Sequence, residues 1–373
     1  MAARALQDGC DTNSLPDARW RRTFERGLRA WYRRHRRDLP WRQTADPYAI
    51  WVSEIMLQQT QVATVVPYFA RFLAAFPDIR TLAAAPERDV LRQWEGLGYY
   101  RRARQMHQAA RVLVEHHGGR FPRDLEAVRA LPGIGRYTAG AIVSIAFDQP
   151  APILEANTVR LLSRLVAYQG NASDGAGQRQ LWDLAAGLLP DSDCGEFNQA
   201  LMELGSLVCT PRAPGCGQCP ASALCAAHRQ HDPERFPRLR PKPQTAQVRE
   251  AAVVVRRGEK VLLRRCASGE RWAGLWDFLR FPVQARRGAA LERELVDGVR
   301  AQAGFAVRPP LRIATFKHTV TRFRITLDCY ETACGPIKKR LSADDWQWVR
   351  IADLADYPLS TTGRKLAKVL SAE

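Results

Sequence analysis

Apolar residues recur at helical spacing near the start of the chain, where Trp20, Phe24, Leu28 and Trp31 follow one another at intervals of three or four residues. This spacing puts them on one face of an amphipathic helix, and arginines cover the other face. Similar helical patterns continue to about residue 228, with no sustained alternation of apolar and polar positions. The pattern therefore predicts an almost entirely helical module over residues 17–228.

The pattern changes after residues 229–248, which are rich in proline and charge and predict an extended polar linker. Beyond this linker, EAAVVVRRGEKVLLRRC predicts two β-strands around a glycine turn, and LERELVDGVRAQAG predicts a helix. RFRITLDCY and WQWVR predict further strands. The predicted fold class is thus multidomain, with an all-α module followed by an α+β domain at residues 249–373.

Two short motifs mark helix boundaries in the first module. Asp46 and Pro47 stand where a capping residue and a first-turn proline are expected before AIWVSEIMLQQT. In LPGIGRYTAGAI, Gly133 and Gly135 permit a tight turn that exposes successive backbone N–H groups. Such a turn is suited to hold a DNA phosphate, although an ordinary helix–helix turn explains the isolated motif equally well.

The charge balance narrows the choice of partner. Lys and Arg number 56 against 38 Asp and Glu, which gives a net charge of +18 and a pI near 10.0. This surplus favours a polyanion such as nucleic acid, and a solvated basic surface is the alternative. No apolar run approaches the roughly 20 residues of a membrane helix. The N-terminus has no secretory h-region, so we expect an intracellular, cytoplasmic protein without membrane contact.

Four of the nine cysteines form a compact motif with the spacing C-x6-C-x2-C-x5-C, namely Cys209, Cys216, Cys219 and Cys225. Four thiolates this close are suited to hold zinc or an iron–sulfur cluster. Zinc ribbons usually pair two distant C-x2-C units, and this motif has a single short pair, so the spacing favours a cluster. The other five cysteines are scattered and are expected to be free thiols.

Two glutamates stand in settings that suit different charge states. Glu54 falls inside a predicted helix beside Trp51 and Ile55, so its pKa should be raised, as a general acid requires. Glu155 precedes a predicted helix in APILEANTVRLLSRL, where Asn157 is expected to be the capping residue and the helix dipole favours an anion. Taken singly, each glutamate also has a structural explanation, as a surface position and as a helix end.

In combination, the acidic helix, GLGYY, the glycine turn, PILEAN and the cysteine loop resemble the helix-hairpin-helix DNA glycosylases with an iron–sulfur loop. The resemblance is strongest to the MutY-type adenine DNA glycosylases and runs from about residue 30 to the end. It implies excision of adenine mispaired with 8-oxoguanine or guanine in double-stranded DNA, by base flipping and N-glycosidic hydrolysis. It also implies a [4Fe–4S] cluster and a Nudix-like C-terminal domain. A single active site per chain makes a monomer sufficient.

The resemblance implies roles for individual residues. Glu54 matches the acid that protonates adenine. Glu155 would stabilise the sugar cation or act as the nucleophile, and Asn157 and Tyr137 would organise that site. This division of work agrees with the chemistry, which needs one protonated and one ionised carboxyl. Tyr137 occupies the position of a Schiff-base lysine in bifunctional relatives, so glycosylase activity without efficient strand cleavage is expected. The implied base-pocket and DNA-binding residues are Trp41, Arg42, Leu57, Gln58, Gln59, Tyr99, Tyr100, Gly133, Gly135 and Gln199.

The C-terminal domain resembles the family's Nudix-like reader of 8-oxoguanine. Phe316, Lys317 and His318 of FKHTV match its lesion-reading loop. A Nudix hydrolase requires paired glutamates where LERELVDGVRAQAG has Asp297 and Gly298. Recognition of the lesion is therefore expected of this domain, and hydrolysis is not.

The chain departs from the family pattern at the sites of catalysis and lesion reading. Glu155 and Ala156 stand where the family has aspartate and glycine, and a displacement of about 1 Å costs ~10²-fold in rate. Lys317 replaces a small hydroxyl residue, although an ammonium group still donates to a guanine edge. Two alternatives stay open: a lesion-binding protein without turnover, and a glycosylase with another base or lesion specificity. A bifunctional lyase and a Nudix hydrolase are the remaining rivals.

Overall fold

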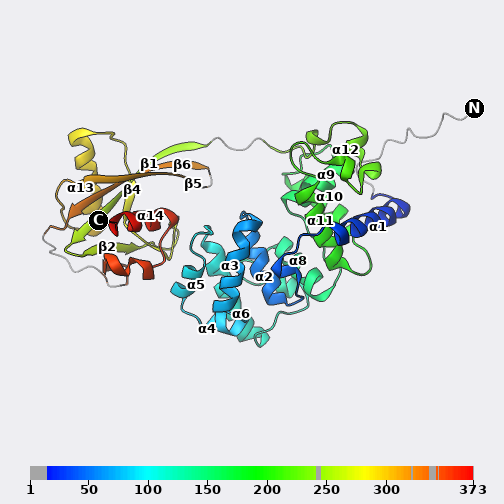
Figure 1. Ribbon diagram of the computed structural model, residues 1–373, viewed down its shortest axis with the longest axis horizontal. Coiled ribbons are helices and arrows are strands. Elements are labelled where there is room, and N and C mark those ends of the chain that lie inside the picture. Colours follow the sequence, from blue (N-terminus) through cyan, green and yellow to red (C-terminus); the bar gives the residue numbers. More distant parts are fainter. Residues whose placement is uncertain (1–14, 241–244, 321, 336–341, 343, 373) are drawn as a thin grey trace, which may run out of the picture. The chain divides into compact units, whose positions relative to one another are not determined.

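The computed structural model describes residues 15–240, 245–320, 322–335, 342 and 344–372. The chain divides into two compact units, residues 1–83 with 108–241 and residues 84–107 with 242–373 (Figure 1). The order of a helical module and then an α+β module is as the sequence predicts. The segment 84–107, which the sequence assigned to the helical module, groups with the C-terminal residues. Residues 241–244 of the expected linker lie outside the described part of the chain.

The first unit is built from helices (Figure 1). One helix, α6, begins in the second unit and continues into the first. The elements of the first unit, in chain order, are α1 (Ala18–His35), η1 (Pro40–Arg42), α2 (Pro47–Leu57), α3 (Val62–Ala75), α4 (Ile79–Ala84), α6 (Arg101–His117), α7 (Leu125–Arg129), α8 (Arg136–Phe147), α9 (Ala156–Leu165), α10 (Gly175–Gly187), α11 (Cys194–Leu207), η2 (Cys216–Gln218), η3 (Ser222–Leu224), α12 (Ala226–Arg229) and η4 (Pro233–Arg235).

Helix starts in this unit follow local side-chain chemistry. The Asp46 carboxylate accepts a hydrogen bond from the Tyr48 N–H at 3.0 Å and caps α2, as predicted. The prediction that Asn157 caps α9 is wrong, because Glu155 is the capping residue. The longer glutamate side chain reaches back to two N–H groups of the first turn, and Asn157 already lies within the helix.

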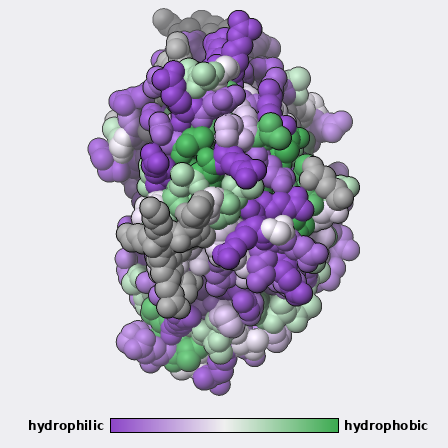
Figure 2. All heavy atoms as spheres, turned by 90° about the vertical axis from the view of Figure 1, so that its left-hand side faces the viewer, coloured by the Kyte–Doolittle hydropathy of each residue, from purple (hydrophilic) through white to green (hydrophobic). Residues whose placement is uncertain are grey.

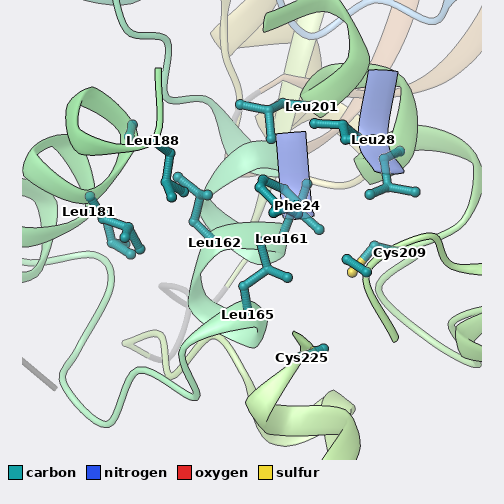
Figure 3. Packing of buried hydrophobic residues seen from close by; sticks show 14 of the residues in the cluster. Phe24, Leu28, Leu161, Leu162, Leu165, Leu181, Leu188, Leu201, Cys209 and Cys225 are labelled. Atoms are coloured by element: carbon teal, nitrogen blue, oxygen red, sulfur yellow. The ribbon is translucent and has the colours of Figure 1, made fainter. Parts of the chain in front are cut away.

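The core of the first unit places α9 between its neighbours. Leu161, Leu162 and Leu165 of α9 pack with residues of α1, α10 and α11, as the labelled side chains in Figure 3 show. Cys209 and Cys225 belong to the same buried cluster. The cysteine loop is therefore packed directly against the helix that begins beside Glu155.

Two glycines bring backbone segments close together near the start of α9. A Cβ on Gly140 in α8 would lie 2.3 Å from the Pro152 carbonyl oxygen. A Cβ on Gly205 in α11 would lie 2.8 Å from the Asn157 Cβ. Both approaches are closer than any side chain allows, so only glycine permits α8 and α11 to pack this tightly around the segment that carries Glu155.

The second unit contains a mixed sheet with the strand order β3-β2-β1-β6-β5, to which β4 and β7 add by pairing with β1 and β2. Strands β1 and β6 are parallel, and the other pairs are antiparallel. Its elements are α5 (Glu87–Gln93), β1 (Ala246–Arg257), β2 (Lys260–Arg265), β3 (Trp276–Asp277), β4 (Leu279–Pro282), α13 (Gly288–Ala303), β5 (Leu311–Val320), β6 (Phe323–Ala333), β7 (Trp346–Arg350), η5 (Ile351–Asp356) and α14 (Thr361–Leu370), together with the start of α6.

Side chains alternate along β1 into two separate cores. Val253 and Val255 pack with residues of α13, whereas Ala252 and Val254 pack with residues of α14. The sheet therefore lies between two helices and is buried on both faces, which accounts for the continuous apolar run in this strand. The predicted hairpin is present, with Gly258 at φ 61° in its turn.

Residues 229–240, expected as extended linker, instead pack on the first unit. Phe236 is buried, and the Arg238 carbonyl accepts a hydrogen bond from the Ala172 N–H at 2.9 Å.

Figure 2 shows hydrophilic side chains over most of the visible surface, with smaller apolar areas between them. Within the part of the chain described, no helix is long and apolar enough to span a membrane.

Candidate active site

A cavity of about 680 Å³ opens in the helical unit, lined by residues of η1, α2, α8 and α11 and by the start of α9. These elements bring together side chains that lie far apart in the sequence. The sequence-predicted residues on its wall are Trp41, Arg42, Glu54, Leu57, Gln58, Gln59, Gly135, Tyr137, Glu155, Asn157 and Gln199.

Glu54 lies on α2 with its side chain turned into the cavity wall and only 6% exposed. Burial raises its pKa to about 7, although a hydrogen bond from the Tyr137 hydroxyl to Oε2 at 2.7 Å acts in the opposite direction. The nearby negative charge of Glu155 raises the pKa further. Near neutral pH this carboxyl is therefore divided between its protonated and ionised forms, as a general acid requires.

Glu155 lines the same cavity in a different setting. Its Oε1 accepts a hydrogen bond from the Thr158 N–H at 3.0 Å, and its Oε2 accepts one from the Asn157 N–H at 2.9 Å. The Thr158 hydroxyl in turn accepts the Glu155 N–H at 2.7 Å, which completes a capping box. The positive end of the α9 dipole and two backbone donors thus hold a carboxylate charge at the cavity wall.

Asn157 links Glu155 to the cysteine loop through Arg160. The Asn157 amide donates to Glu155 Oε2 at 3.2 Å and accepts a hydrogen bond from Arg160 Nη2 at 2.8 Å. Arg160 is buried, and its Nε donates to the Cys209 carbonyl at 2.7 Å. Arg160 was not predicted from the sequence. Its position one helical turn after Asn157 is the one feature of the sequence that could have indicated its role.

A second buried acid, Glu203 of α11, also lines the cavity and was missed. Arg42 forms a two-pronged ion pair with it at 2.8 Å for each contact, and Arg37 adds further hydrogen bonds. Burial opposes its ionisation, but the bonds from Arg42 and Arg37 lower the pKa of Glu203 to about 2. Arg42 is therefore held rigidly beside the predicted adenine pocket, near Trp41, which packs edge-on against Phe69.

The end of α2 and the glycine turn provide exposed positions next to the cavity. Gln59 follows α2 in the left-handed region at φ 58°, and Gln58 donates to the Thr138 hydroxyl at 3.4 Å. Gly133 has φ 76°, which suits only glycine at low cost. Gly135 is extended and begins α8, with open space where a side chain would project. The backbone at Gly133 and Gly135 is thus exposed, whereas the Ile134 N–H between them donates to the Leu131 carbonyl at 3.1 Å.

In the second unit, the structure separates the paired tyrosines of GLGYY. Tyr99 is 47% exposed at φ 48°, after Gly98 at φ 71°. Tyr100 is buried, and its hydroxyl donates to the Leu359 carbonyl at 3.2 Å. Of the two residues, only Tyr99 is presented to solvent.

The four cysteines of the loop line one small, apolar cavity. Arg164 is buried beside them, and its Nη1 lies 3.3 Å from the Cys209 sulfur. Burial raises the pKa of the Cys219 thiol to about 12, so a cation is needed for this thiol to ionise. Among the described residues no three side chains converge closely enough for a single metal ion. The donor set is sulfur only, which is the chemistry that an iron–sulfur cluster would require of these four side chains.

Phe316, Lys317 and His318 lie on strand β5, where sequence analysis placed a loop. Phe316 packs on the α14-side core, Lys317 is exposed, and the His318 ring lies 6.4 Å from the Trp272 ring. Burial lowers the pKa of His318, and the positive charge of Arg280 lowers it further. The neutral imidazole is therefore favoured.

Helix α13, which would carry the carboxylates of a Nudix hydrolase, uses the corresponding positions for packing and hydrogen bonding instead. A Cβ on Gly298 would lie 2.4 Å from the Phe281 ring, so a glutamate there would require this ring to move. The Glu294 carboxylate accepts hydrogen bonds from the N–H groups of Gln284 and Ala285. These contacts oppose a catalytic carboxylate cluster on α13.

Comparison with protein families gives two matches. Residues 52–186 match the model of the HhH-GPD superfamily base excision DNA repair proteins, and residues 251–369 match the NUDIX domain. The adenine DNA glycosylase of Rattus norvegicus is 41% identical over 273 residues, which cover 71% of this chain and 52% of that protein. That of Buchnera aphidicola subsp. Schizaphis graminum is 34% identical over 264 residues, which cover 70% and 76%. The chain spans about half the length of the mammalian relatives it matches.

Solved structures agree on the fold of the helical part. A thermostable thymine-DNA glycosylase is 32% identical, with a TM-score of 0.53 that covers 57% of this chain and 98% of that one. Endonuclease III in a non-covalent DNA complex is 20% identical, with a TM-score of 0.50. The match covers 58% of this chain and 99% of that one. The second likeness concerns the fold alone.

Proposed function

This chain belongs to the family of adenine DNA glycosylases of MutY type, and we propose that it excises adenine mispaired with 8-oxoguanine or guanine. The observation that carries the proposal is a pair of carboxyls on one cavity wall in contrasting environments. Glu54 is buried with its pKa raised to about 7, and Glu155 is held at a helix N-terminus. This division matches the two carboxyl roles in cleavage of a glycosidic bond.

In the proposed reaction, adenine leaves the base stack and enters the cavity that Trp41, Arg42 and Gln199 line. Glu54 transfers its proton to a ring nitrogen of the adenine, so the base departs as a neutral leaving group. The Glu155 carboxylate stabilises the positive charge that develops on the sugar, and water completes the hydrolysis.

We propose that residues at the end of α2, together with Tyr99 of the second unit, extrude the base. Gln58 and Gln59 would enter the space that adenine leaves, and Tyr99 would insert beside the opposite base. The N–H groups of the turn at Gly133 and Gly135 would hold a backbone phosphate. The net charge of +18 favours association with the duplex and makes it salt-dependent.

The strand opposite the adenine would be read by the C-terminal module. Lys317 is exposed on β5 beside His318, and an ammonium group donates to the carbonyl edge of guanine or 8-oxoguanine. The packing of Gly298 and Glu294 favours recognition over hydrolysis for this module.

We further propose that the reaction ends with base release. Tyr137 has no amine to attack the sugar, and its hydroxyl is already bonded to Glu54. Borohydride treatment during turnover should therefore trap no covalent DNA adduct.

The decisive experiment measures single-turnover adenine release from duplexes with adenine opposite 8-oxoguanine, guanine or thymine. We expect release opposite 8-oxoguanine and guanine, and none opposite thymine. Tight binding to the mispair with no release would identify a lesion-binding protein instead. Release of a different base, or release opposite thymine, would identify a glycosylase of another specificity.

The raised pKa of Glu54 predicts how the rate depends on pH. The active form is protonated, so the single-turnover rate constant should fall as pH rises through about 7. Tyr137→Phe removes a hydrogen bond that lowers the pKa of Glu54. The fall of its rate constant with rising pH, the descending limb of its profile, should therefore occur at higher pH than in wild type. Rate constants measured from pH 5.5 to 9, roughly two units around the pKa of Glu54, test both effects. Identical limbs in the two proteins would contradict the assignment of Glu54.

We also propose that Cys209, Cys216, Cys219 and Cys225 hold a [4Fe–4S] cluster. When bound, this group cross-links the loop that packs on α9, and Arg164 supplies a buried positive charge beside the thiolates.

Removal of one proposed ligand should abolish cluster binding. Protein purified without oxygen should contain about four iron and four sulfide per chain, and Cys219→Ser should lose most of both. Cys334→Ser, which changes a half-buried cysteine of the C-terminal module, is the matched control and should retain them. Zinc in place of iron, or full iron content in Cys219→Ser, would reject the proposal.

A further inference from the structure

The loop that presents Tyr99, residues 96–99, is fastened to the C-terminal module within the second unit. Glu95 immediately precedes this loop, and its carboxylate receives two hydrogen bonds from Arg364 of α14, at 2.5 and 2.9 Å. Both side chains are about four-fifths buried, with 18% and 22% exposed. A two-pronged pair in this setting is screened much less than a surface ion pair.

Arg364 is itself fixed at a defined place in the C-terminal module. Its remaining donors contact the Leu354 carbonyl at 2.7 Å and the Tyr357 carbonyl at 2.6 Å. Each of these bonds narrows the orientations open to the guanidinium group. The position of the Glu95 carboxylate is therefore tied to the backbone between η5 and α14.

A second contact holds the other side of the loop. Tyr100 immediately follows it, and its buried hydroxyl donates to the Leu359 carbonyl at 3.2 Å. The loop backbone is specialised as well, since Gly96, Gly98 and Tyr99 all have positive φ. A tyrosine in the left-handed region persists only when its surroundings impose that conformation.

We propose that the Glu95–Arg364 pair couples the reading of the opposite base by the C-terminal module to the insertion of Tyr99. Glu95 and Arg364 act as positioning residues, because each acts through the segment that it holds. With the pair intact, the C-terminal module already holds the Tyr99 loop in place. The binding free energies of the loop and the module on DNA then add, because the loop loses no further conformational freedom on binding. With the pair broken, of these two contacts only that of Tyr100 still fastens the loop, so the Tyr99 loop must lose additional conformational freedom when it engages the duplex. This inference rests on the proposed function, since it assumes that both elements contact DNA.

The test compares dissociation constants for full-length protein on duplexes with a non-cleavable adenine analogue opposite 8-oxoguanine or guanine. Glu95→Gln keeps the size of the side chain and removes its charge. We expect the preference for 8-oxoguanine over guanine to fall about five- to tenfold, as loss of a partly buried charge-assisted pair allows. Arg92→Gln breaks the exposed Arg92–Asp356 pair and should leave the preference within about twofold.

Two further readouts distinguish coupling from simple loss of stability. Combining Glu95→Gln with Arg364→Leu should lower the preference no more than either change alone, because both remove the same pair. Amide exchange in free Glu95→Gln protein should rise at residues 96–100 while the midpoint of thermal unfolding stays close to that of wild type.

Four outcomes would each overturn the coupling. Glu95→Gln could keep the wild-type preference or bind both duplexes equally more weakly. The effects could be additive in the double variant, or the wild-type protein could show no preference for 8-oxoguanine over guanine. The non-cleavable analogue keeps this result separate from the proposed function. Failure of wild type to release adenine would reject the enzymatic proposal, while the binding comparison would still test the pair.

Discussion

Glu54→Gln is expected to release adenine about 10²–10⁴-fold more slowly than wild type under single-turnover conditions. Glutamine has the same size and still accepts the hydrogen bond that Tyr137 donates at 2.7 Å, but it has no acidic proton to transfer. Because the protonated wild-type carboxyl is the active form, the loss should be largest below its pKa of about 7 and should shrink as pH rises through that value.

The control for this variant is its affinity for a duplex with a non-cleavable adenine analogue. Removing a buried ionisable group should leave the midpoint of thermal unfolding unchanged or raised, because burial penalises the charged form. Binding within about threefold of wild type would therefore place the defect in the chemical step. If Glu54→Gln releases adenine as fast as wild type, Glu54 is not the general acid, whatever the affinity of the variant for the duplex.

The sequence was sufficient for elements whose boundaries depend on local chemistry. The Asp46 cap, the turn at Gly133 and the hairpin turn at Gly258 each involve residues close in the chain, so composition and spacing reveal them. The buried strand β1 was also recognised, because its run of valines serves two cores. Such features need no knowledge of the tertiary fold.

Contacts between distant segments were beyond local patterns. Glu203 follows Arg42 by 161 residues, and nothing near either residue indicates that they form a buried pair. The Arg160 contact with the Cys209 carbonyl likewise depends on how α9 packs against the cysteine loop. Tyr99 and Tyr100 have the same local signal, and only the contact with Leu359 distinguishes the buried residue from the exposed one.

The error at α9 has a specific physical cause. Asparagine is a common capping residue, so Asn157 was favoured on propensity alone. Glu155 has one more methylene than the family's aspartate, and its carboxylate still folds back to accept hydrogen bonds from the N–H groups of Asn157 and Thr158. The extra length is thereby taken up by the side chain, while the charge remains at the start of the helix.

This geometry leads to the second prediction, which concerns charge at position 155. Glu155→Gln should slow adenine release about 10²–10³-fold, since the developing sugar cation loses its countercharge. Glutamine retains an oxygen that accepts one backbone N–H, so helix capping is lost only in part and unfolding should shift by about 1 kcal/mol or less. Loss of the neighbouring charge should also lower the pKa of Glu54 and move the descending pH limb to lower pH.

Glu155→Asp provides the matched comparison, because it retains the charge and shortens the side chain. Aspartate is also a strong capping residue and is expected to use the same first-turn donors. We therefore expect its rate constant to stay within about tenfold of wild type, well below the ~10²-fold loss that an uncompensated displacement of about 1 Å would cause. A large gain in Glu155→Asp over an inert wild type would instead mean that the longer side chain has removed the catalytic charge from its working position. Equal rates in Glu155→Gln and wild type would exclude any electrostatic role for this carboxylate.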